Sequence, residues 1–220
     1  MTKVKICGLK SIEDISYANR LRPDYIGFVF LEGRARYVSP DLAANLRNSL
    51  DPSIPAVGVF VNEPVKQPAS LFQKGIIQMV QLHGNEDAAY VKALKELCGC
   101  PVIKAFIIRS KEDVEKALSF PCDYLLLDNG LGTGKSFDWS LIQNIQKPFF
   151  LAGGLTPENA ADAAALVHPF ALDVSSGVET DGRKDYQKIK AFISNTKGGI
   201  SCHNQKDASE FTADNTFPKH

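Results

Sequence analysis

The stretch PFFLAGGLTPENA, residues 148–160, followed by ALDVSSG, residues 171–177, decides the fold. Each segment begins as a nearly continuous apolar run and ends in glycine or serine. Apolar runs with little alternation are typical of strands that are covered on both faces. Thr156 before Pro157 is a cap residue ahead of a first-turn proline, which predicts that a helix starts there. The stretch therefore predicts a strand, a helix and a second strand, the repeating unit of a parallel sheet.

The same unit recurs along the chain. Six further apolar runs precede it, at residues 4–9, 25–30, 55–61, 79–84, 102–108 and 124–129. Each run is followed by a helix signal, such as the capping-box spacing of Ser11 with Asp14, or Ser39 before Pro40. The helix after Pro64 is the least supported, because Pro68 interrupts it early. Eight such units predict closure into a barrel.

The predicted fold is of the α/β class, a single (β/α)8 TIM barrel over residues 1–196. The alternative is a doubly wound open sheet, which should show a glycine fingerprint for phosphate after its first strand. The segment CGLKS, residues 7–11, is not that fingerprint. Residues 197–220 are polar and without period, so we expect a disordered C-terminal tail.

The composition of the chain argues against several functional classes of protein. The chain has 220 residues with 25 Lys and Arg against 25 Asp and Glu, so its formal net charge is zero and nothing indicates a nucleic-acid-binding surface. No apolar run approaches the ~18 residues that span a bilayer, so no membrane partner is expected. The 5 cysteines form no disulfide framework, and Cys98-Gly99-Cys100 lacks a second ligand pair for zinc. We therefore expect a protein of the reducing cytoplasm without a metal site.

In a (β/α)8 barrel the active site lies at the carboxyl ends of the strands. Polar and titratable residues gather at those points here, among them Cys7, His83, Asp128 and Asp173. The loops after the seventh and eighth strands predict a phosphate cradle, because glycines let backbone N–H groups approach an anion. The predicted cradle consists of Gly153, Gly154, Ser175, Ser176 and Gly177. The segment GLGTGKSFDW, residues 130–139, departs from a nucleotide P-loop and is better interpreted as a flexible loop that covers a substrate.

The ordered set KICGL, GFVF, ARYVSP, VGVFVNEP, QLHGNE, LLLDN, GTGKSFDW, LAGGL and DVSSGVE resembles the phosphoribosylanthranilate isomerase family of tryptophan biosynthesis. The resemblance covers about residues 3–195. It implies a barrel of the ribulose-phosphate-binding type that needs no cofactor. It also implies an Amadori rearrangement of N-(5-phosphoribosyl)anthranilate to 1-(2-carboxyphenylamino)-1-deoxyribulose 5-phosphate.

The resemblance also implies roles for single residues. Cys7 is the expected base and Asp128 the expected acid. Arg36 corresponds to the residue that pairs with the anthranilate carboxylate, although the nearby Arg34 leaves the choice between the two open. His83 is expected either to orient the substrate or to be a hydrogen-bonded structural histidine, and Asp173 is expected to hold a ribose hydroxyl.

The base and acid roles invert the ordinary order of acid strengths, because a free aspartic acid has a lower pKa than a free cysteine thiol. We therefore expect nearby cations or donors to lower the pKa of the Cys7 thiol. Two alternatives remain open at this point. One is the sister phosphosugar isomerase of histidine biosynthesis, which would want an aspartate in place of Cys7. The other is a non-catalytic barrel that binds a phosphometabolite. A monomer and a homodimer are equally compatible with the sequence.

Overall fold

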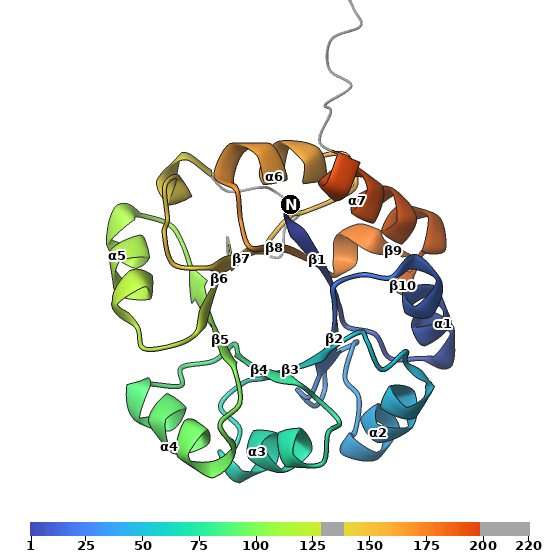
Figure 1. Cartoon of the computed structure of the whole chain (residues 1–220), viewed down its shortest axis with the longest axis horizontal. Coiled ribbons are helices and arrows are strands. Elements are labelled where there is room, and N and C mark those ends of the chain that lie inside the picture. The colour runs from blue at the N-terminus through green and yellow to red at the C-terminus, as the bar shows by residue number, and fades with distance from the viewer. Residues whose placement is uncertain (129–138, 199–220) are drawn as a thin grey trace, which may run out of the picture.

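A computed structural model describes residues 1–128 and 139–198 of the chain and shows eight parallel strands closed into a barrel. Figure 1 looks along the barrel, with the strands as an inner ring and the helices outside it. The strands are β1 (Lys3–Cys7), β2 (Tyr25–Val29), β3 (Ala56–Phe60), β4 (Met79–Leu82), β5 (Val102–Ile107), β6 (Tyr124–Asp128), β7 (Phe149–Leu151) and β8 (Ala171–Val174). Each strand pairs with its neighbour in sequence, and β1 pairs with β8 to close the ring. The predicted (β/α)8 fold is confirmed.

Seven α-helices in the described residues surround the strands. They are α1 (Ile12–Leu21), α2 (Pro40–Ser49), α3 (Lys66–Gln73), α4 (Ala88–Cys98), α5 (Lys111–Ser119), α6 (Ala160–Val167) and α7 (Tyr186–Gly198). The predicted capping box at Ser11 is present, a second one at Ser110 begins α5, and Ser39 caps α2 ahead of Pro40. Pro68 lies in the first turn of α3, where its missing N–H costs no helical hydrogen bond. None of the described helices is long and apolar enough to cross a membrane.

Two helix predictions need correction. Between β6 and β7 the described residues contain only a short 3-10 helix, η1 (Trp139–Ile142), in place of an α-helix. Helix α6 begins at Ala160 and not at Pro157, and its N-cap residue is Asn159. The reason is a turn closed by Asn159, whose side chain accepts from the Thr156 N–H at 2.9 Å and donates to the Gly154 carbonyl at 2.9 Å. Helix α7 runs to Gly198 and so includes Lys197, which pairs with Asp24 at 3.0 Å.

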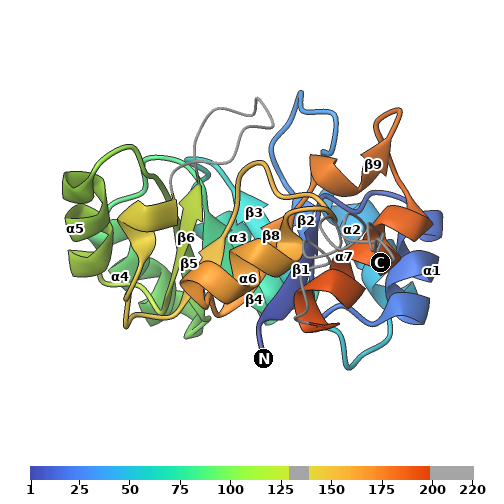
Figure 2. The ribbon, with the colours of Figure 1, turned by 90° about the horizontal axis from the view of Figure 1, so that it is seen from above.

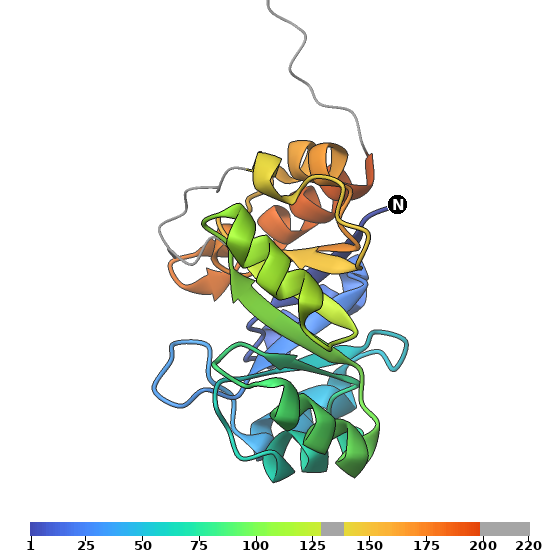
Figure 3. The ribbon, with the colours of Figure 1, turned by 90° about the vertical axis from the view of Figure 1, so that its left-hand side faces the viewer.

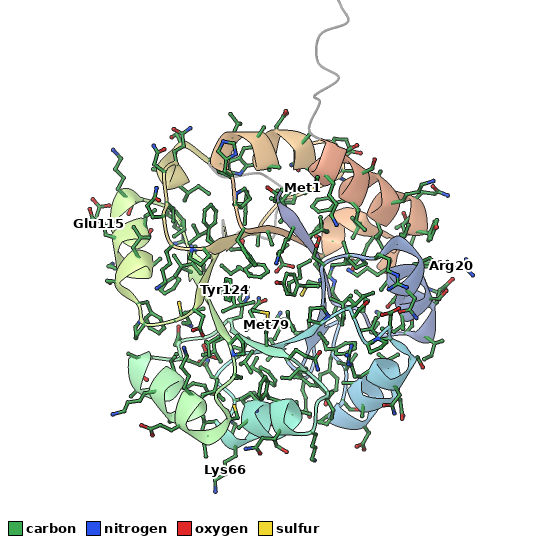
Figure 4. The ribbon with its side chains drawn as sticks, viewed as in Figure 1. Met1, Arg20, Lys66, Met79, Glu115 and Tyr124 are labelled. Carbon is green, nitrogen blue, oxygen red and sulfur yellow. The ribbon has the colours of Figure 1, made fainter. Side chains whose placement is uncertain are left out.

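The alternation of side chains along each strand produces two cores. One lies between the strands and the helices, and it includes Val4, Ile6 and Phe28. The other fills the inside of the barrel, with Met79 and Phe150 at its centre and Tyr124 packed against it. Figure 4 shows Met79 and Tyr124 within the ring, whereas Lys66 and Glu115 point outward from the helices. The barrel is therefore a packed core whose free space lies at its ends.

The carboxyl ends of the strands form one face of the barrel. Two connections rise from this face: the loop after β2, and a hairpin after β8 made of β9 (Glu179–Thr180) and β10 (Arg183–Lys184). Figures 2 and 3 show both connections projecting from the same side of the molecule, opposite the N-terminus. A second short 3-10 helix, η2 (Ser176–Val178), lies between β8 and this hairpin. These connections surround the site described next.

Candidate active site

A cavity of about 750 Å³ opens at the carboxyl face of the barrel. All ten residues that the sequence predicted for the site line it, together with Arg34. They are Cys7, Arg36, His83, Asp128, Gly153, Gly154, Asp173, Ser175, Ser176 and Gly177. The strand order of the closed barrel brings together residues that are up to about 170 positions apart in the chain. The structure therefore places the predicted acid, base and phosphate loops in one cavity, as the barrel rule requires.

Cys7 is the last residue of β1 and is buried at the floor of this cavity. The chain turns immediately after it, because Gly8 adopts a φ of 81°, which favours glycine. Space for the thiol comes from Gly27, the register partner of Cys7 on β2. A Cβ at Gly27 would lie 2.7 Å from the Cys7 Sγ, closer than real contacts allow. Gly27 was not among the predicted site residues, although a glycine inside an apolar strand is a signal of close approach.

The prediction that the pKa of Cys7 is lowered is wrong. Burial raises the pKa of the Cys7 thiol, and the negative charge of Asp173 adds to this effect. The positive charges of Lys5 and Lys184, and a hydrogen bond with Lys5, act in the opposite direction but do not outweigh burial. The cations expected from the sequence are therefore present, but they lower the pKa of Cys7 by less than burial raises it.

A buried chain of polar side chains crosses the barrel below Cys7. The Lys5 ammonium donates to Asp173 Oδ2 at 2.8 Å and to Gln81 Oε1 at 2.8 Å. The Gln81 amide nitrogen lies 3.0 Å from His83 Nδ1, so the chain ends at the cavity mouth. Asp173 Oδ1 is buried and has no hydrogen-bond partner among the described residues. Sequence reasoning named His83 and Asp173 but missed Lys5 and Gln81, whose signal is a polar residue at an inward position of an otherwise apolar strand.

A second polar group stands beside Cys7 on the hairpin side. Arg36, in the loop after β2, donates from Nε and Nη2 to the two carboxylate oxygens of Glu179 at 2.7 and 2.6 Å. Lys184 Nζ also donates to Glu179 Oε1 at 2.7 Å and to the Ser175 carbonyl at 2.9 Å. Burial alone would raise the pKa of Glu179, but the hydrogen bonds from Arg36 and Lys184 lower it to about 2. Nothing in the local sequence signals these partners, since Arg36 and Glu179 are 143 residues apart.

Asp128 ends β6 on the cavity wall and is half-buried, and its negative charge is felt at His83. His83 keeps an exposed edge at the mouth, while the barrel walls around the ring desolvate it and lower its pKa. A neutral imidazole at this position can accept or donate a hydrogen bond. The two groups are therefore placed to face a ligand from the β4 and β6 side of the cavity.

The predicted phosphate loops lie between Asp128 and Cys7, because β7 and β8 stand between β6 and β1. Gly153 and Gly154 have φ values of 88° and 67°, a conformation that glycine adopts without strain. A side chain at Gly177 would collide with the Leu155 carbonyl, so the two loops touch through their backbones. The Ser175 hydroxyl donates to the Cys7 carbonyl at 3.0 Å and thereby ties β8 to β1.

No group of three His, Cys, Asp or Glu side chains within residues 1–128 and 139–198 is arranged to hold a metal ion. The GTGKS segment, which was predicted to be a loop over a substrate, lies outside the described residues.

The fold and the cavity together define a (β/α)8-barrel enzyme whose chemistry takes place at the carboxyl face of the strands. The family "N-(5'phosphoribosyl)anthranilate (PRA) isomerase" matches residues 4–195. The chain belongs to this family.

Individual relatives agree with this. The N-(5'-phosphoribosyl)anthranilate isomerase of Lachnoclostridium phytofermentans is 43% identical over 209 residues, which are 87% of this chain and 95% of the relative. A solved phosphoribosyl anthranilate isomerase in complex with reduced 1-(o-carboxyphenylamino)-1-deoxyribulose 5-phosphate is 40% identical, with a TM-score of 0.80 over 90% of this chain and 100% of the other. The dimeric enzyme from Thermotoga maritima, solved as monomers, is 39% identical, with a TM-score of 0.78 over the same shares.

The function follows from family membership. The chain is an intramolecular oxidoreductase that isomerises N-(5'-phosphoribosyl)anthranilate in tryptophan biosynthesis. The histidine-pathway isomerase and the non-catalytic binding barrel, both left open by the residues alone, are thereby set aside.

Proposed function

We propose that this chain performs the Amadori rearrangement with Cys7 as the general base and Asp128 as the general acid, and without a cofactor. The observation that carries the proposal is the strand order β6, β7, β8, β1. In this order the loops after β7 and β8 lie between Asp128 and Cys7, and all of them line a single cavity. A sugar anchored by its phosphate at those loops therefore lies between Asp128 on one side and Cys7 on the other.

The proposed steps need one proton donor and one proton acceptor. Asp128 protonates the furanose ring oxygen, so the ring opens to a Schiff base between C1 and the anthranilate nitrogen. The Cys7 thiolate then takes the proton from C2, and the electron pair of that C–H bond neutralises the iminium to give an enolamine. Tautomerisation to the ketone, with protonation at C1, completes the product. The proton that Asp128 gives up and the proton that Cys7 gains balance over the turnover.

The phosphate is proposed to bind at Gly153, Gly154, Ser176 and Gly177, beside the start of η2 at Ser176. Barrel enzymes commonly bind phosphate with the loops after strands 7 and 8 and a short extra helix. The solved relative carries a ligand with a phosphate and a carboxyphenylamino group, which supports a substrate of the same class here. Ser175 contributes through its position in the loop, because its hydroxyl hydrogen is directed to the Cys7 carbonyl.

For the anthranilate carboxylate we propose Arg36 and not Arg34. Two N–H groups of Arg36 hold Glu179, which leaves Nη1 for a ligand and fixes the plane of the guanidinium. Arg34 lines the cavity but is exposed. Asp173 Oδ1, buried and without a partner among the described residues, is proposed to accept from a ribose hydroxyl.

Assembly and location follow from the same proposal. The dimeric Thermotoga maritima relative favours a homodimer over a monomer, which sedimentation equilibrium can check. The proposed base must be a free thiol, as Cys7 is here, and the reducing cytoplasm keeps thiols in that state. We further propose that residues 1–196 form the catalytic domain and that residues 197–220 add nothing to the reaction.

The experiment that tests the proposal follows the anthranilate-type fluorescence when purified protein is mixed with phosphoribosylanthranilate. The fluorescence should fall with the wild-type chain, whereas Cys7→Ala should bind the substrate without consuming it. Full turnover by Cys7→Ala would show that Cys7 is not the base.

A further inference from the structure

Lys5 is a charged residue in a place where an apolar one would be expected. It is fully buried, and it alternates along β1 with Val4 and Ile6, which pack toward the helices. Its side chain therefore lies inside the barrel, on the same face of the strand as Cys7. A buried ion pair is weak evidence for stability, because apolar residues of similar volume serve as well or better. The presence of Lys5 therefore indicates a role other than stabilising the fold.

The Lys5 ammonium is held by acceptors on two other strands of the barrel. One N–H group donates to Asp173 Oδ2 on β8 at 2.8 Å, and another donates to Gln81 Oε1 on β4 at 2.8 Å. Cys7 lies two residues along β1, so its side chain points to the same interior side of the strand as that of Lys5. The carboxylate and the amide therefore fix the ammonium inside the barrel, next to the thiol on its own strand.

The Lys5 side chain keeps its positive charge. Burial alone would lower the pKa of Lys5, but the charges of Asp173 and Cys7 and the hydrogen bonds to them raise it. The ammonium therefore stays protonated at every pH at which the enzyme would work. A permanent cation close to a sulfur inside the protein favours the thiolate over the thiol.

Other charged groups also face the Cys7 thiol. Asp173 on β8 opposes ionisation, whereas Lys184 on β10 and Arg36 in the loop after β2 favour it. Both of these cations are shared with Glu179, to which they donate at 2.6–2.7 Å. The two hairpin-side cations therefore share their charge between Glu179 and the thiol, whereas Lys5 lies on the same strand as Cys7 and on the same face of it.

We propose that Lys5 is a positioning residue that acts through Cys7, because its buried ammonium stabilises the thiolate that removes the C2 proton. The role in proton removal rests on the proposed function of Cys7, whereas the effect on the thiolate does not. Lys5 itself does not touch the substrate, since it lies below the cavity.

The test measures alkylation of Cys7 by iodoacetamide as a function of pH, with the Cys7 peptide quantified by mass spectrometry. In Lys5→Met, which keeps the length of the side chain and removes the charge, the midpoint should move up by about one pH unit or more. Alkylation at about pH 7.5 should then slow by about tenfold. Lys5→Arg should keep the midpoint near that of the wild type. The matched control is Lys104→Met, which removes another buried lysine, paired with Glu86 at 2.9 Å, and should leave the Cys7 midpoint unchanged.

An unchanged midpoint in folded Lys5→Met would overturn the proposal. If Lys5→Met does not fold, Asp173→Asn is compared with Lys5→Met/Asp173→Asn. The double variant removes both charges of the ion pair, so no unpaired charge is left buried. The midpoint must still be higher in the double variant than in Asp173→Asn. The alkylation experiment distinguishes the Lys5 proposal from the proposal that Cys7 is the base. Activity retained in Cys7→Ala would refute only the role of Cys7 as the base. The effect of Lys5 on the Cys7 thiolate is measured without substrate and does not depend on that role.

Discussion

Cys7 and Gly27 are direct neighbours across β1 and β2, and the thiol occupies the space that a side chain at position 27 would need. A methyl group at Gly27 would lie 2.7 Å from the sulfur and 3.1 Å from the Cys7 Cα. The position of the proposed base is therefore set from the next strand as much as from its own.

The first prediction concerns Gly27→Ala. The added methyl group should push the sulfur out of line with the sugar, so kcat should fall by about a hundredfold, as expected for a misplacement of about 1 Å. Steady-state kinetics from the fluorescence assay measure this. Gly58→Ala is the control, because its Cβ would meet Ile77 and Phe60 at 2.7 Å, in the core away from Cys7. It should destabilise the fold and leave the kcat of the folded fraction unchanged, and equal losses in both variants would contradict the explanation.

The second prediction concerns the acid and the base. Cys7→Ser and Asp128→Asn should each lose a factor of about 10² to 10⁴ in kcat, the usual share of general acid–base catalysis. Because burial raises the pKa of Cys7, kcat/KM of the wild type should climb with pH through neutrality as the thiolate fraction grows. A pH profile of kcat/KM checks the sign. An Asp128→Asn variant with full activity would place the acid elsewhere.

The third prediction separates the two arginines of the loop after β2. Arg36→Ala should raise KM by about ten- to a hundredfold, because a charge-assisted hydrogen bond contributes about 1.5–3 kcal/mol. Arg34→Ala should change KM less than threefold, since its side chain is exposed and pays more entropy to bind. Titration with the reduced product analogue gives the same comparison as a dissociation constant. The reverse order of the two effects would assign the carboxylate to Arg34.

The fourth prediction concerns Glu179, which pairs with both Arg36 and Lys184. Glu179→Gln should lower the free energy of unfolding near pH 7 by about 2 kcal/mol. The loss is smaller than for a fully buried pair because the Arg36 side chain is 33% exposed. The folded pKa of Glu179 is about 2, below the ordinary value of 4.5, so its contribution is complete above pH 4.5 and lost as the pH falls toward 2. Urea unfolding curves should therefore converge for the two proteins in acid. A gap that stays constant down to about pH 2 would contradict the ion-pair explanation.

Much of the fold could be predicted because its signals are local. The eight apolar runs, and caps such as Ser11 with Asp14, depend on residues within one element. The start of α6 was misplaced because Thr156-Pro157 is an equally good turn signal, and Asn159 decided between the two. The connection after β6 was expected to be helical by repetition alone, without apolar periodicity of its own.

Residues of the candidate site could be predicted where they lie at the carboxyl end of a strand or within a motif shared with the family. The supporting residues could not be, because their partners are distant in the chain. Lys5 is read from the sequence as one polar residue in an apolar strand, and its meaning appears only when β8 brings Asp173 beside it. Glu179 ends the DVSSGVE motif, but the motif does not indicate its partners, and only the closed barrel shows that Glu179 binds both Arg36 and Lys184.

The closure of the ring between β1 and β8 has a consequence for the time at which the thiol becomes functional. In a growing chain Cys7 is made about 165 residues before the strand that carries Asp173. Until then the sulfur has neither its cavity nor the second half of its charge environment, and long-range pairing of this kind forms late. The reactivity of Cys7 therefore departs from that of an ordinary cysteine only after the first and last strands have paired, and a half-folded chain still carries an ordinary cysteine.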